Sequence, residues 1–86
     1  MNFGHVENPA LRAYLMGAQT LSTVEAFDLS TDCLEADIRA DECGMESAPP
    51  IDALNAREAA HERARLALGK NDLDGARKAL QDMWIA

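Results

Sequence analysis

Apolar residues recur at intervals of three and four along most of this chain, which is the spacing of an amphipathic α-helix. Helix-breaking residues interrupt the repeat at intervals, so the sequence divides into four candidate helices. We expect helices over residues 9–20, 23–43, 52–68 and 73–84, with residues 45–50 as a linker that contains two consecutive prolines. Because the chain has only two Val, three Ile and three Thr, strands are disfavoured. The predicted fold class is all-α: a small bundle of three or four short helices.

Residues with short polar side chains precede each predicted helix and indicate where it begins. Asn8 stands before Pro9, and Ser22 with Glu25 has the form of a capping box. The other expected N-caps are Asp52 for the third helix and Asn71 or Asp72 for the fourth. Ser30 is a further candidate cap, so residues 23–43 form either one long helix, which we favour, or two shorter ones.

The apolar spacing also predicts which side chains form the core. In the second helix these are Val24, Phe27, Thr31, Leu34 and Ile38. In the third they are the alanines Ala53, Ala56, Ala60, Ala64 and Ala67, and in the fourth Leu73, Ala76, Leu80 and Trp84. The alanine seam allows two helices to approach closely, so the C-terminal pair is expected to form an antiparallel hairpin.

Residues 68–80 resemble the turn and second helix of a tetratricopeptide hairpin. In that family an Asp-apolar-acidic-x-Ala run opens the second helix, and here the matching residues are Asp72-Leu73-Asp74-Gly75-Ala76. The resemblance covers one unit, whereas such solenoids usually stack about three repeats. It therefore implies a tight antiparallel helix pair and no peptide-binding groove.

At 86 residues and 9.3 kDa the chain has room for one small domain, here residues 1–86. Its net charge is −7, from 8 basic and 15 acidic residues. Eight of those acids and a single base lie between residues 25 and 46, so this segment carries the whole net charge. We therefore expect no direct binding to nucleic acid and none to an anionic membrane surface, because both require a basic patch.

The acidic residues of the second helix follow a helical spacing that places five of them on one side: Glu25, Asp28, Asp32, Glu35 and Glu42. Like charges so arranged destabilise a helix by about a few tenths of a kcal/mol per pair. Carboxylates about one turn apart resemble a line of phosphates and fit a groove built for nucleic acid. One interpretation is therefore a nucleic-acid mimic that blocks a basic surface of a partner protein. The other is a solvated face that keeps the protein soluble.

Sites for chemistry are not indicated by the sequence. Acids, His and Cys show neither calcium-loop order nor zinc-ligand spacing, so we expect no metal and no cofactor. Cys33 and Cys43 would lie about 15 Å apart on one helix, too far for a disulfide. His61, beside Arg57, Glu58, Glu62 and Arg65, is interpreted as part of a solvated helical face with local ion pairs. No nucleophile turn or phosphate-binding loop is recognisable, so we expect no catalytic residue and no enzymatic activity.

The first helix offers an alternative interface. Its second face is nearly uncharged and carries Ala13, Met16, Gly17 and Thr20. A helix without a charged face is usually buried on more than one side, either in the bundle or against a partner. The alternative function is thus a small helical adaptor or subunit, with a homodimer as one form.

The N-terminal residues show no signal-peptide pattern, and the longest uncharged run, residues 13–24, is too short and polar to span a bilayer. We expect a cytoplasmic protein with reduced thiols. The function expected from size and charge is that of an inhibitor or decoy, by analogy with the anti-CRISPR and anti-restriction proteins of phages and other mobile elements. Its partner would be a protein with a basic surface, such as one that handles nucleic acid.

Overall fold

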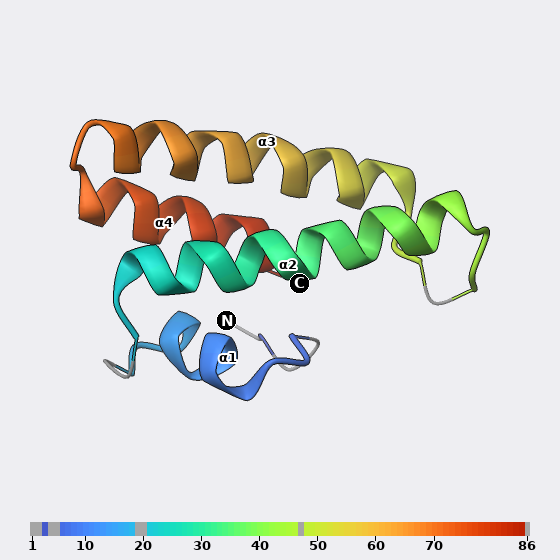
Figure 1. The fold of residues 1–86 in the computed structure, drawn as a ribbon, viewed down its shortest axis with the longest axis horizontal. Coiled ribbons are helices and arrows are strands. Elements are labelled where there is room, and N and C mark those ends of the chain that lie inside the picture. Colours follow the sequence, from blue (N-terminus) through green and yellow to red (C-terminus); the bar gives the residue numbers. More distant parts are fainter. Residues whose placement is uncertain (1–2, 4–5, 19–20, 47, 86) are drawn as a thin grey trace.

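The computed structural model describes residues 3, 6–18, 21–46 and 48–85, and within these ranges it contains four α-helices and no strand. They are α1 (Pro9–Leu15), α2 (Thr23–Glu42), α3 (Ile51–Gly69) and α4 (Leu73–Trp84). α3 and α4 form an antiparallel hairpin and are the helices in closest contact. α2 runs alongside this hairpin, and in the view of Figure 1 the short α1 lies below α2, on the side opposite to the hairpin. The all-α fold and the C-terminal hairpin are thus confirmed.

Three of the four helices end in the same way, with a left-handed residue that reverses the chain. Gly17, Gly44 and Asn71 have φ values of 105°, 68° and 58°. After each of them the next amide bonds back to a carbonyl five residues earlier, as Ala18 N does to Ala13 O at 2.9 Å. This is the Schellman arrangement, which satisfies carbonyls that have no partner within the helix.

The prediction of a first helix to residue 20 is wrong for this reason. The helix ends at Leu15 and is capped at Met16, because Gly17 adopts a backbone conformation that a helix cannot continue. Gly17 is therefore a stop signal and not part of an apolar stripe. Thr20 lies outside the described residues.

The helix starts agree with the sequence in three cases. The Asn8 side chain accepts hydrogen bonds from the amides of Ala10 and Leu11, Ser22 Oγ accepts one from Glu25 N, and Asp72 Oδ1 accepts one from Gly75 N at 3.0 Å. The start of the third helix, α3, differs from expectation. α3 begins at Ile51 after Pro50, with no side-chain cap, and Asp52 lies within its first turn.

Residues 23–42 form one continuous helix, and Ser30 does not begin a second one. Its side chain is fully buried, and Ser30 Oγ accepts a hydrogen bond from the indole Nε1 of Trp84 at 3.1 Å. A small hydroxyl thus lets α4 approach α2 while it satisfies the single buried indole donor.

Among the described residues, fourteen buried side chains make one core, with contributions from every helix and from Phe3 and Val6 before α1. Three residues predicted to be in the core are instead exposed: Val24, Ala56 and Leu73. Val24 and Leu73 occupy the first turns of α2 and α4, at the end of the bundle. Ala56 is exposed on α3, whose buried residues are Leu54, Ala60 and Ala64. On α2 the buried face is centred on Ala26, Ser30 and Leu34.

Candidate functional site

The acidic face of α2 consists of Glu25, Asp28, Asp32, Glu35 and Glu42, and all five residues are exposed. At 3.6 residues per turn their side chains occupy an arc of about 100° around the helix and extend over about 25 Å. Ser30, the centre of the buried face, lies about 180° around the helix from the middle of this arc. The sequence therefore places these carboxylates together on the solvent side, as predicted.

None of these five carboxylates forms an ion pair with any residue that the structure describes. Asp37 is the acid of α2 that does. Its Oδ2 lies 2.8 Å from Nη1 of Arg57 on α3, and both side chains are mostly buried, with 27% and 17% exposed. Sequence reasoning missed this pair. The available signal was the position of Asp37, three residues after buried Leu34 and thus on the inward side of the helix.

Two residues modify the acidic face, namely its member Glu25 and the neighbouring Arg39. Glu25 accepts a hydrogen bond from the Ser22 hydroxyl, so part of its role is to hold the start of α2. Arg39 occupies the step between Glu35 and Glu42 and is also exposed. It divides the row into a run of four acids over the first three turns and a single acid in the last.

A shallow hollow lies beside the acidic face, toward the C-terminal half of α2. It has a volume of about 240 Å³ and is lined by Glu35, Ile38 and Arg39. Ile38 is half-buried and packs against the core, so its apolar surface lies between a carboxylate and a guanidinium. This is where apolar surface adjoins the acidic face.

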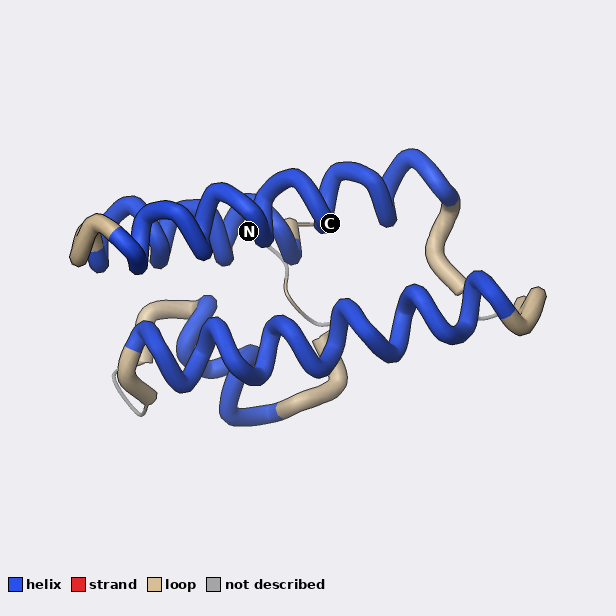
Figure 2. Tube along the Cα trace, turned by 45° about the horizontal axis from the view of Figure 1, so that its top comes forward, coloured by secondary structure: helices blue, strands red, loops and turns tan. Residues whose placement is uncertain are grey.

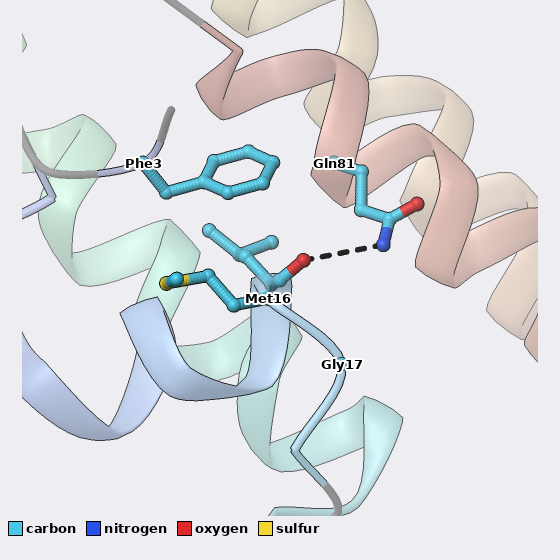
Figure 3. Close-up of a pocket in the computed structure, with 5 residues that line it drawn as sticks. Phe3, Met16, Gly17 and Gln81 are labelled. Carbon is cyan, nitrogen blue, oxygen red and sulfur yellow. Dashed lines mark hydrogen bonds between the residues drawn. The ribbon is translucent and has the colours of Figure 1, made fainter. Parts of the chain in front are cut away.

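The residues proposed as an alternative interface do not continue one helical stripe. Ala13 is half-buried on α1, Met16 caps the helix with 68% of its surface exposed, and Gly17 lies in the turn that follows. Met16 and Gly17 border a cavity of about 250 Å³ that is also lined by Phe3, Leu15 and Gln81. Figure 3 shows Gln81 of α4 donating to the carbonyl oxygen of Leu15 across this cavity, at 3.3 Å.

His61 and Arg57 are not part of a solvated face, and that prediction is wrong for both. The His61 ring stacks on Phe27 at 4.6 Å between centroids, and its Nε2 lies 2.8 Å from Thr31 Oγ1. Thr31 Oγ1 also lies 3.0 Å from the backbone oxygen of Phe27, so the Thr31 hydroxyl links His61 to the backbone of α2. The pair Glu62–Arg65 is exposed as expected, and its hydrogen bond lowers the pKa of Glu62.

These contacts give His61 a packing role between α2 and α3. Within the part of the chain that the structure describes, no group of three or more His, Cys, Asp or Glu side chains is placed to hold a metal ion. The cysteines are both free: Cys43 is exposed and Cys33 is half-buried. Burial, with added repulsion from Asp37, Asp32 and Glu7, raises the pKa of the Cys33 thiol.

Among the described residues, none of the helices has the length and apolar character needed to cross a membrane. A scan of protein-family models finds no match, and searches of curated proteins and of solved structures find no similar chain. The resemblance of residues 68–80 to a tetratricopeptide hairpin is therefore one of local sequence.

Proposed function

We propose that this protein is a non-enzymatic inhibitor or decoy, and that its acidic face on α2 occupies a basic, nucleic-acid-binding surface of a partner protein. One observation carries the proposal. Asp37, the acid of α2 that turns inward, is paired with Arg57, whereas the five outward acids lie in a row without an ion pair to any described residue. Such a row costs helix stability through repulsion, and a cationic partner would relieve that cost.

The dimensions of the row suit this role. About 25 Å of helix presents carboxylates that are mostly one turn apart, and a groove that binds nucleic acid offers cations at a comparable spacing. The analogy in size and charge is with the anti-CRISPR and anti-restriction proteins of phages. We propose that the protein acts in the cytoplasm, where Cys33 and Cys43 would remain reduced.

Capture of partners from host lysate, at low and at high salt, tests the proposal. We expect a nucleic-acid-handling protein that binds at low salt and is released at high salt. The variant Asp28→Lys, Asp32→Lys, Glu35→Lys should lose it. A control of equal charge change, Glu7→Lys, Glu58→Lys, Asp74→Lys, should retain it, since these three residues are exposed and lie outside α2. Equal loss in both variants would show only a general charge effect and would contradict the proposal.

The alternative of a helical adaptor is favoured by one observation, the 68% exposure of Met16 beside the cavity near α1. For an adaptor, Met16→Lys should abolish capture of a partner that salt does not release. Gly17→Leu would not be a clean test, because a φ of 105° strains any larger residue there.

A further inference from the structure

The part of α2 and α3 next to their linker extends beyond the other helices. Trp84, the last residue of α4, lies under the Arg57 guanidinium at 5.0 Å, and Arg57 pairs with Asp37 of α2. These contacts mark the level at which the packing of α4 ends. Beyond it, only α2 and α3 continue among the described helices, as Figures 1 and 2 show. We call residues 38–46 and 48–56 the tip.

The tip is anchored to the common core through Leu54, but it leaves large apolar side chains uncovered. Leu54 is 3% exposed, and the linker residues Ala48 and Pro49 are half-buried. Met45, the first residue of the linker, and Ile51, the residue that follows it, are 56% and 57% exposed. Ile38 adds the apolar surface of the hollow between Glu35 and Arg39. The tip therefore presents apolar surface on both of its helices.

Charge on the tip indicates what kind of molecule would cover that surface. The exposed acids around it are Asp41, Glu42, Glu46 and Asp52. Arg57, which directly follows the tip, is already paired with Asp37, and Arg39 is the one base in the sequence of the tip itself. A second copy of this chain would bring acids against acids, whereas a cationic molecule would meet complementary charge.

We propose that the tip binds a cationic amphipathic helix, whose apolar side chains cover Ile38, Met45 and Ile51 and whose Lys and Arg side chains pair with the surrounding carboxylates. The inference rests on the proposed function, since that helix would belong to the same basic partner. The acidic face and the tip then have different roles. Solvated charges mainly accelerate association, while desolvated apolar anchors slow dissociation, and methionine is enriched in such anchors.

Two synthetic helical peptides of about 18 residues test this inference, one of Lys and Leu and one in which Ser replaces every Leu. Calorimetric titration measures their affinity at low and at high salt. We expect the leucine peptide to keep its binding at high salt and to bind Met45→Ser, Ile51→Ser about tenfold more weakly. The control Leu66→Ser, at a residue 50% exposed on α3 outside the tip, should leave its affinity unchanged.

The outcomes separate this inference from the proposed function. If Met45→Ser, Ile51→Ser binds the leucine peptide as well as the wild type does, the inference about the tip is overturned. This holds even if charge reversal at Asp28, Asp32 and Glu35 abolishes binding of the serine peptide. Equal weakening by Leu66→Ser would also overturn it, because it would indicate general hydrophobic adhesion. A third outcome is that Met45→Ser, Ile51→Ser weakens binding of the leucine peptide, while reversal of the charges at Asp28, Asp32 and Glu35 leaves binding of the serine peptide intact. That result would support the binding site at the tip and contradict the proposed role of the acidic face.

Discussion

Arg57 connects three helices at the residue scale. From α3 it pairs with Asp37 of α2 and lies over the ring of Trp84 of α4, whose indole donates to Ser30. The apolar stem of Arg57 packs in the bundle, and its guanidinium is paired with a carboxylate. The domain therefore tolerates a basic side chain of which only 17% is exposed. The sequence shows only an Arg beside a Glu and a His on a helix.

Removal of the Arg57 side chain is expected to be costly. Arg57→Ala leaves Asp37 mostly buried without its cation, and we expect the free energy of unfolding to fall by about 1–3 kcal/mol in urea denaturation. The matched control is Arg63→Ala. Arg63 lies 3.9 Å from Asp82 with both side chains about half exposed, so its loss should cost about 0.5 kcal/mol or less. Equal losses in the two variants would refute this account of Arg57.

The two cysteines should differ in reactivity. The thiolate is the reactive form, and burial together with nearby carboxylates raises the pKa of Cys33, so less of it is ionised at any pH below that pKa. Cys43 is exposed beyond the end of α2. We expect iodoacetamide at mildly alkaline pH to modify Cys43 first, as mass spectrometry of the digested protein would show. Faster modification of Cys33 would mean that α2 opens readily.

At the scale of the element, the helix ends are determined by single residues. Gly17→Ala places a Cβ at a φ of 105°, and we expect a loss of about 1 kcal/mol in the free energy of unfolding. Gly69→Ala is the control, because Gly69 lies at the end of α3 with ordinary helical backbone and open space around it. There the substitution should stabilise the protein by about 0.5 kcal/mol. Thermal denaturation of both variants, with opposite shifts, would confirm the two backbone roles.

The helices themselves could be predicted from the sequence, since periodicity and caps such as Asn8, Ser22 and Asp72 are local signals. The end of α1 could not, because Gly17 fits an apolar stripe as well as a stop signal. The rotation of α2 was also missed: Ala26 and Ser30 are inward because α4 packs closely there, which is a tertiary effect. The exposure of the acidic face was predicted correctly, whereas the inward pairs of Arg57 and His61 depend on which helices become neighbours.

For the whole molecule, a net charge of −7 concentrated in one segment opposes compaction. Added salt should therefore raise the free energy of unfolding, by about 0.5–1 kcal/mol between 0.05 and 0.5 M NaCl, as repulsion along the acidic face is screened. The variant Asp28→Lys, Asp32→Lys, Glu35→Lys should show a smaller increase than the control variant of equal charge change. The same increase in both would indicate that the acidic face carries no particular repulsion.

A displacement assay tests the central claim most directly, namely that the acidic face of α2 occupies a nucleic-acid-binding surface. The partner captured from lysate is loaded with fluorescent nucleic acid, and this protein is titrated in while anisotropy is recorded. The account predicts that the wild type releases the nucleic acid at a near-equimolar concentration, and that the control with Lys at positions 7, 58 and 74 does the same. The variant with Lys at positions 28, 32 and 35 should release none. Nucleic acid that stays bound while the wild-type protein joins the complex would contradict it.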